Sequence, residues 1–196
     1  MHCFISNLYK DKNFCNKINE YGIECGYVNP DGKGNIEYMA ESHNQCREKA
    51  IEIGAEFLLH WEVDIFTHYR SIVELLLLRK KAVVSGVYHI RHGVDSHLCL
   101  TVRHQKHPLE LATAFNLTDG ADLMFVDGNA KQVANAGLGL SMIHKSVFEK
   151  MKFRADRYER AHPDSTFAED LHYAKIPVFA DTSLLMEHRN SKWLHL

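Results

Sequence analysis

Apolar runs of strand length alternate with segments of helical spacing over the first ninety residues. The strand-like runs cover residues 4–5, 23–28, 56–61 and 82–90. Helical spacing is found in residues 8–21, in residues 39–53, and in a segment capped by Thr67 or Ser71 and ended by the cations at 79–81. Because strands alternating with helices are typical of α/β proteins, the pattern predicts a mainly parallel central sheet flanked by helices.

The second half of the chain is less regular. Residues 91–120 are polar and rich in histidine, and the pattern assigns them no structure. Short strands are predicted at 123–126, 132–134, 138–143, 178–180 and 184–186. A helix carrying Val147 and Phe148 follows the third of these, residues 153–167 are predicted as a loop, and a short helix begins at about Ala168 and ends before Pro177. Since no repeat or linker interrupts the pattern, we expect a single domain over residues 1–196.

Composition narrows the function classes. Hydrophobic residues make up 45% of the chain and charged residues 24%, as in folded globular proteins. The formal net charge is −2 without a basic block, which argues against nucleic acid as a partner. No apolar run approaches the roughly 20 residues of a membrane span, and the first residues do not resemble a secretion signal, so a cytoplasmic location is expected. The five cysteines and fourteen histidines show no zinc-binding spacing, and the cysteines are interpreted as mostly buried thiols.

An acidic triplet follows the most apolar predicted strand. Glu62, Val63 and Asp64 come directly after residues 56–61. In open α/β sheets, ligands bind beyond the carboxyl ends of strands, and carboxylates there can share Mg²⁺ or Mn²⁺ with a diphosphate. A solvated turn at a strand end explains the triplet equally simply.

Three further features carry candidate chemistry, each with a structural alternative. Asp170 can serve as a general base, whereas its neighbour Glu169 also fits a helix capping box with Thr166. Gly137 and Gly139 allow a ligand to approach the backbone, or simply allow tight packing. His188 follows the last predicted strand and is one of many histidines.

Taken in order, these residues resemble the GT-A-fold glycosyltransferases, most closely glycosyltransferase family 2. The features that match are Asn44 six residues before Ala50, the apolar run 57–59, Glu62-Val63-Asp64, Ser85-Gly86-Val87-Tyr88, Gly137-Leu138-Gly139, Lys145 before Val147-Phe148-Glu149-Lys150, Glu169-Asp170, and His188. The resemblance covers most of the chain. Two positions depart from the family pattern: Glu62 replaces the usual first aspartate, and His43 stands where arginine commonly precedes Asn44.

The resemblance implies a Rossmann-like GT-A domain in which residues 1–90 bind the nucleotide and residues 91–196 form the acceptor and catalytic half. The implied activity is transfer of a sugar, with inversion, from a nucleoside-diphosphate sugar to a hydroxyl of a glycan, protein or small molecule. Asp64 and His188 would hold Mn²⁺ or Mg²⁺, and Asp170 would be the catalytic base. The implied donor-binding positions are Asp31, Asn44, Glu62, Asp64, Gly137, Gly139 and Glu169. Asp31 is also explained as a turn residue.

Other functions remain open at this point. A catalytically idle module that binds a nucleotide sugar or a glycan would keep the same scaffold, and Glu62 in place of aspartate suits this alternative. A metal-dependent hydrolase that uses some of the histidines is a second alternative. A retaining glycoside hydrolase needs two carboxylates about 5 Å apart, a geometry that sequence does not determine.

Overall fold

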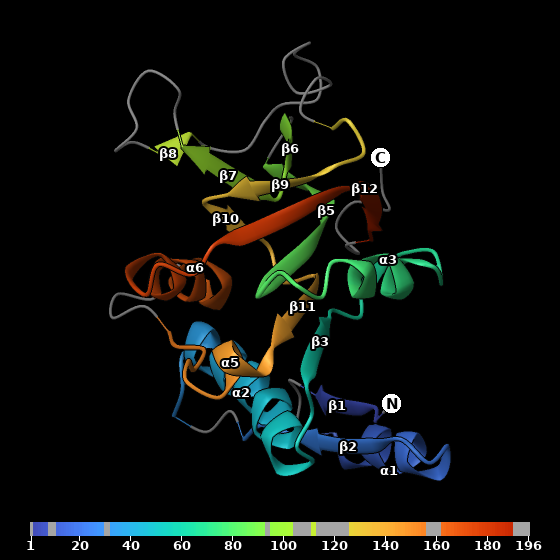
Figure 1. Cartoon of the computed structure of the whole chain (residues 1–196). Coiled ribbons are helices and arrows are strands. Elements are labelled where there is room, and N and C mark those ends of the chain that lie inside the picture. Colours follow the sequence, from blue (N-terminus) through green and yellow to red (C-terminus); the bar gives the residue numbers. More distant parts are fainter. Residues whose placement is uncertain are drawn as a thin grey trace. The chain divides into compact units, whose positions relative to one another are not determined.

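The computed structural model describes residues 2–7, 11–29, 32–92, 95–103, 111–112, 126–155 and 162–189 (Figure 1). It divides into two compact units, each built from two stretches of the chain. Unit 1 comprises residues 1–58 and 145–167, and unit 2 comprises residues 59–144 and 168–196. The prediction of one domain over the whole chain stays a prediction.

Unit 1 opens with a parallel strand pair joined by a helix. Its elements are β1 (Phe4–Asn7), α1 (Lys12–Glu20), β2 (Glu24–Tyr27), α2 (Asn35–Glu52) and α5 (Lys145–Phe148). The parallel pairing of β1 with β2 fits the sequence prediction. Asp11 caps α1 by accepting a hydrogen bond from the Phe14 backbone N–H at 3.0 Å. Both predicted helices therefore form, and α1 starts at Lys12, directly after its capping residue Asp11.

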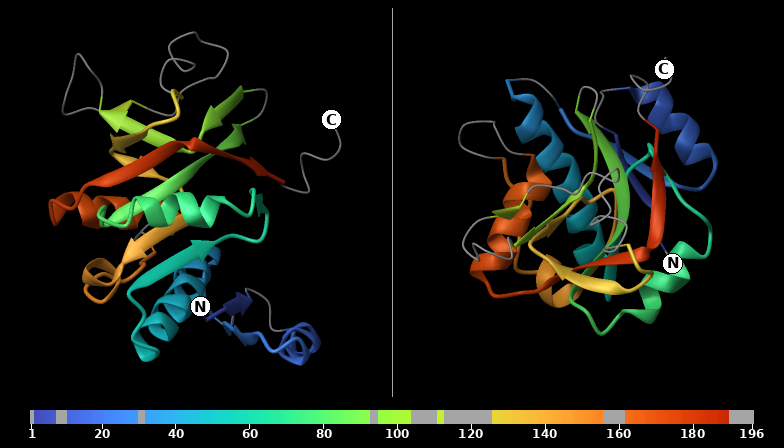
Figure 2. Two further views of the ribbon diagram at one scale, coloured as in Figure 1. Left: turned by 45° about the vertical axis from the view of Figure 1, so that its right-hand side comes forward. Right: turned by 90° about the horizontal axis from the view of Figure 1, so that it is seen from above.

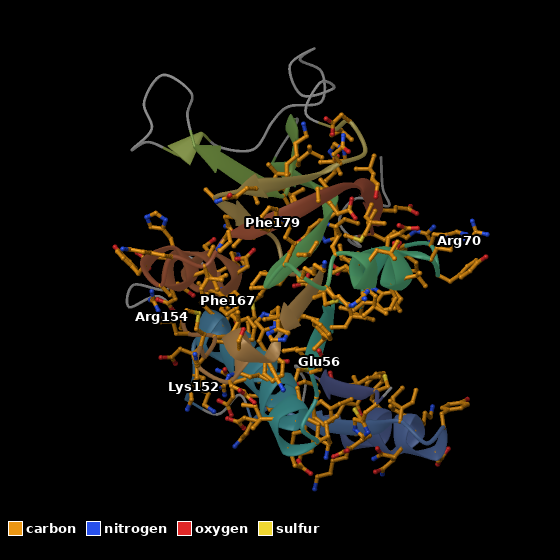
Figure 3. All side chains as sticks on the ribbon, viewed as in Figure 1. Glu56, Arg70, Lys152, Arg154, Phe167 and Phe179 are labelled. Atoms are coloured by element: carbon orange, nitrogen blue, oxygen red, sulfur yellow. The ribbon has the colours of Figure 1, made fainter. Side chains whose placement is uncertain are left out.

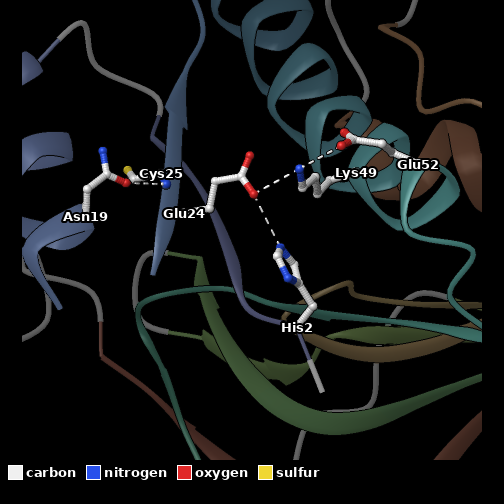
Figure 4. A network of polar contacts seen from close by, with 6 residues as sticks. All are labelled: His2, Asn19, Glu24, Cys25, Lys49 and Glu52. Atoms are coloured by element: carbon white, nitrogen blue, oxygen red, sulfur yellow. Dashed lines mark hydrogen bonds and ion pairs between the residues drawn. The ribbon is translucent and has the colours of Figure 1, made fainter. Parts of the chain in front are cut away.

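Polar side chains of α2 hold the segment that follows α5. The Arg47 guanidinium is buried and donates to the carbonyl oxygens of Met151 at 2.7 Å and Glu149 at 3.1 Å. These carbonyls follow a helix end, where a cation is favoured. Lys49, also on α2, donates to Glu24 and Glu52, and His2 also contacts Glu24 (Figure 4). Unit 1 is thus held together partly by charged groups.

Unit 2 is built on a seven-stranded sheet. The strands are β3 (Phe57–Trp61), β4 (Ile65–Phe66), β5 (Val83–His92), β6 (Asp95–Leu98), β9 (Ala130–Val133), β11 (Leu140–His144) and β12 (Val178–His188). The order is β3-β11-β5-β12-β4, with β6 paired to β5 and β9 paired to β12. Residues 59–61 of β3 belong to this unit. A smaller sheet contains β7 (Leu100–Arg103), β8 (Leu111–Ala112) and β10 (Asn135–Ala136).

The prediction of a mainly parallel sheet is not met. In unit 2, β5 and β12 run parallel, whereas β12 pairs antiparallel with β4 and with β9, and β5 pairs antiparallel with β6 and with β11. The prediction assumed helical crossovers between neighbouring strands, but β11 and β12 enter the sheet on either side of β5 from later parts of the chain. The architecture is therefore a mixed α/β fold with helices beside a mixed sheet (Figure 2).

Two predictions near the end of the chain are wrong in detail. Helix α6 (Pro163–Tyr173) begins five residues before the predicted start at Ala168. Proline suits the first helical position because its missing N–H has no partner there anyway. The two predicted strands at 178–180 and 184–186 form the single strand β12, whose pairing with β5 shifts register between Asp181 and Leu185. The polar residues 181–183 fall at this irregularity, so one strand shows two separate apolar runs in the sequence.

Helix α3 (Ser71–Leu77) contacts β5 and β12 through the buried Leu75 side. Its N-cap position is Arg70, and no side chain caps it, so the capping expected from Thr67 or Ser71 is not found. Among the helices of the described ranges, none combines the length and apolar character needed to cross a bilayer.

Candidate functional site

A tight turn and a strand pairing bring Asp64 beside His188. The Ile65 backbone N–H donates to the Glu62 carbonyl at 3.1 Å, which closes a turn directly after β3. The chain then enters β4, in which Ile65 pairs with His188 of β12. The Arg189 backbone N–H also donates to the Asp64 carbonyl at 2.8 Å. The end of β3 and the end of β12 therefore meet at one place in unit 2.

The two side chains at this place form a carboxylate–imidazole pair. His188 Nε2 lies 3.1 Å from Asp64 Oδ2, and His188 Nδ1 lies 3.1 Å from the His89 carbonyl oxygen. The imidazole is mostly buried, with 13% of its side chain exposed, whereas Asp64 is 37% exposed. One face of the carboxylate is thus open to solvent.

The carbonyl contact decides which nitrogen of His188 carries hydrogen. Because a carbonyl oxygen only accepts, Nδ1 must donate to His89. Nε2 faces Asp64 Oδ2, so a proton or a cation held between these two atoms would be bound by both.

Tyr88 packs against His188 and leaves no room for a side chain at Gly137 or Gly139. Its ring meets the His188 ring edge-on at 5.4 Å between centroids, and its hydroxyl accepts from the Gly139 N–H at 3.3 Å. A Cβ at Gly137 would lie 2.0 Å from the Tyr88 hydroxyl, and a Cβ at Gly139 would lie 2.6 Å from the ring. Close packing against Tyr88 thus accounts for both glycines. A donor-binding role for Gly137 and Gly139 stays a prediction.

Glu62 belongs to the same neighbourhood through its backbone. Its N–H donates to the Gly139 carbonyl at 2.8 Å, so the glycine segment fixes the start of the acidic turn. Between Glu62 and Asp64, Val63 is almost fully exposed. The turn therefore presents its middle to solvent while its two ends are held by the sheet.

Asn44 lies in unit 1, where its side-chain amide forms hydrogen bonds with the backbone of Phe153. Its Nδ2 donates to the Phe153 carbonyl at 2.7 Å, and its Oδ1 accepts from the Phe153 N–H at 3.0 Å. It also lines a groove of about 730 Å³ whose lining carries three cations and three acids. Asp31, the predicted contact for the base or ribose, lies outside the described residues.

Glu169 and Asp170 are in α6, whose residues 168–173 directly precede β12. Glu169 is exposed in the middle of the helix, so the capping box expected from Thr166 does not form. The Thr166 hydroxyl donates instead to the carbonyls of Arg154 and Pro163. Asp170 lies in α6, which precedes β12 in the chain, whereas His188 is the last residue of β12 (Figure 1). The role of Asp170 stays a prediction.

Sequence reasoning missed the residues that support the pair. In the sequence, Tyr88 stands out only in the Ser85-Gly86-Val87-Tyr88 match and His89 only in a predicted strand. The bulky Tyr88 and the small residues Gly137 and Gly139 are the signal of complementary packing. Within the described ranges, no group of three or more His, Cys, Asp or Glu side chains is arranged to hold a metal ion.

Comparison with known proteins supports the fold and goes no further. No family model matches the chain, and no curated protein matches it. The crystal structure of A197 from STIV is similar, with a TM-score of 0.56 and 16% sequence identity over 98% of this chain and 87% of that chain. A structure of CMP:2-keto-3-deoxy-manno-octonic acid synthetase complexed with CTP has a TM-score of 0.48 and 12% identity over 92% of this chain and 71% of that chain. The first likeness shows a shared fold, and the second is too weak to support an inference.

Proposed function

We propose that this protein is a metal-dependent glycosyltransferase that moves a sugar from a nucleoside-diphosphate sugar to an acceptor hydroxyl. The observation that carries the proposal is the contact between Asp64 and His188, 124 residues apart in the chain, at the end of a sheet. Both residues belong to the ordered set of features that resembles glycosyltransferase family 2. No comparison with a known protein supplies this activity, so the proposal depends on these residues.

The pair fits a divalent cation such as Mn²⁺ or Mg²⁺. One carboxylate oxygen and one imidazole nitrogen are suitable donors, and the carbonyl of His89 orients the imidazole through its other nitrogen. Neighbouring ligands of an octahedral ion with bonds of about 2.1 Å lie about 3 Å apart, close to the observed 3.1 Å. Two protein ligands suffice for such ions when a substrate diphosphate and water complete the shell.

In the proposed reaction the acceptor hydroxyl loses its proton to a general base while its oxygen attacks the anomeric carbon. The resemblance gives the role of base to Asp170 of α6, which the described strand pairings do not bring beside Asp64 and His188. The bond from the anomeric carbon to the diphosphate oxygen breaks, and the nucleoside diphosphate leaves with the bonding electron pair. A single displacement of this kind inverts the anomeric centre. A bound divalent ion would neutralise charge on the diphosphate. Glu62 would contact the donor ribose or a water, next to Asp64.

Calorimetric titration with Mn²⁺ tests the metal site directly. We expect Asp64→Asn and His188→Gln to weaken Mn²⁺ binding by at least about tenfold, since each removes one of two protein ligands. Glu187→Gln changes an exposed acid beside His188 and should leave binding unchanged. Equal Mn²⁺ affinity in Asp64→Asn and in the unaltered protein would refute the metal site. Repeating the titration with nucleoside diphosphates present would identify the nucleotide.

The role of Asp170 is tested separately. Asp170→Asn should abolish transfer and leave donor affinity nearly unchanged, because a general base acts on the acceptor and not on donor binding. Asp164→Asn is the matched control, because it makes the same change at an acid in the first turn of the same helix. Unchanged transfer by Asp170→Asn would exclude this residue as the base, and loss of donor binding would make it a ligand or a structural residue.

A catalytically idle module that binds a nucleotide sugar is the second candidate. It is favoured by the position of α6 at the beginning of β12, away from the Asp64–His188 pair (Figure 1). Turnover distinguishes the two: an enzyme releases nucleoside diphosphate from the donor, at least slowly to water, whereas an idle module binds the donor and leaves it intact.

A further inference from the structure

Helix α3 is apolar on its outward face. Val73, Leu76 and Leu77 are 54%, 42% and 65% exposed, while Ser71 and Leu75 on the opposite face are buried. Spacings of three and four residues place the three exposed side chains together on one side of the helix. A surface helix normally turns polar residues outward, so both faces of α3 are suited to apolar surroundings.

Cations flank α3 on both sides in the sequence. Arg70 precedes the helix, and Arg79, Lys80 and Lys81 follow it, whereas Glu74 is the one acid between residues 70 and 81. Arg70 points away from the sheet (Figure 3). In the part of the chain that the structure describes, no ion pair joins any of these four cations to a carboxylate. Cations after a helix suit its dipole, but the dipole does not explain exposed leucines beside them.

The composition of the surface favours a lipid bilayer over a protein partner. Protein interfaces are depleted of lysine, and valine and leucine are rare among their dominant residues. Helices that lie on membranes combine leucine on the buried side with flanking lysine and arginine, and tyrosine is frequent at the water boundary. Tyr69, at 73% exposure, occupies that boundary position before α3. A second copy of the chain would bring like charges together, which is unfavourable.

We infer that residues 69–81 form a docking surface for an anionic phospholipid bilayer. Val73, Leu76 and Leu77 would enter the headgroup boundary, and the exposed Arg70, Arg79 and Lys80 would contact the lipid phosphates and carboxylates. Lys81 lies 4.0 Å over the Phe179 ring of β12 and is not counted among these contacts. The inference is independent of the proposed glycosyltransferase activity, because it uses neither Asp64 nor His188.

Co-sedimentation of the full chain with vesicles tests this surface. We expect binding to vesicles of phosphatidylcholine with about 30% phosphatidylserine, little binding to pure phosphatidylcholine, and release by high salt. Each cation contributes about fivefold to partitioning, so Arg79→Glu with Lys80→Glu should lower binding at least about twentyfold. Leu77→Ser should also lower binding, because it removes the most exposed of the three apolar side chains.

Matched controls change the same residue types elsewhere. Lys17→Glu with Lys150→Glu reverses two exposed cations, and Ile53→Ser removes an exposed apolar side chain in unit 1. These variants should bind vesicles like the unaltered chain, and circular dichroism should show all variants folded. Binding that ignores phosphatidylserine, or that falls equally in the controls, would overturn the inference. A dimer in sedimentation velocity that Leu77→Ser dissociates would assign the face to a second copy instead and would equally overturn it.

Discussion

Replacing Gly139 by alanine should destabilise unit 2 by a predictable amount. The new methyl group would lie 2.6 Å from Tyr88 Cε1, 2.7 Å from Ile65 Cγ1 and 2.8 Å from Tyr88 Cζ. All three atoms belong to buried side chains, and an aromatic ring has no flexible end that can move aside. Overpacking in a buried site costs about 1–3 kcal/mol, and three such contacts place Gly139→Ala near the upper end, about 3 kcal/mol.

Gly86→Ala is the matched control in the same sheet. Its methyl group would meet Met186 Cε at 2.6 Å and Sδ at 2.9 Å, which are the flexible end of a methionine. Because that end can change rotamer, we expect a cost below about 1 kcal/mol. In a chain of this size, 3 kcal/mol corresponds to a fall in Tm of about 6–12 °C. Thermal and urea unfolding followed by circular dichroism measure both variants.

The same substitution should also weaken Mn²⁺ binding. Gly139 donates to the Tyr88 hydroxyl and accepts from the Glu62 N–H, and Tyr88 packs against His188. A displaced Gly139 would therefore shift the acidic turn and the imidazole together. If Gly139→Ala unfolds within about 0.5 kcal/mol of the unaltered protein, or if Gly86→Ala is the less stable variant, the packing argument is refuted.

Two further predictions concern ionisable groups of unit 1. The hydrogen bond from Lys49 lowers the pKa of Glu24 below its usual 4.5, so the stabilisation is present above that pH and is lost as pH falls through the lowered pKa. The Tm difference between Glu24→Gln and the unaltered protein should therefore shrink as pH falls below 4.5, and a difference that stays constant with pH would contradict the assignment. Burial raises the pKa of Cys46 to about 11, so iodoacetamide at pH 8 should label the exposed Cys3 well before Cys46, as peptide mass spectrometry would show. Equal labelling rates would mean that Cys46 is accessible.

Local patterns predicted much of the fold because they record burial directly. The apolar run at 56–61 predicts a strand, and β3 forms at Phe57–Trp61. Leu58 and His60 of this strand are buried. The direction of strands is not recorded in such a pattern. An apolar strand such as β11 (Leu140–His144) looks the same in sequence whether its neighbour β5 runs parallel or antiparallel. The mixed sheet therefore could not be distinguished from a parallel one.

The candidate site shows the same division between local and long-range information. Asp64 could be identified because it follows a buried strand, but its contact with His188 depends on the pairing of Ile65 with His188, two residues 123 positions apart. The two-residue strand β4 that makes this pairing is too short to leave a periodic signal. Sequence order suggested that Asp64 and His188 belong together, and the antiparallel register supplies the physical reason: the end of β12 passes the start of β4. Asp170 has no comparable strand pairing to carry it to that end of β12, which is why its substitution is the sharpest test between an enzyme and a binding module.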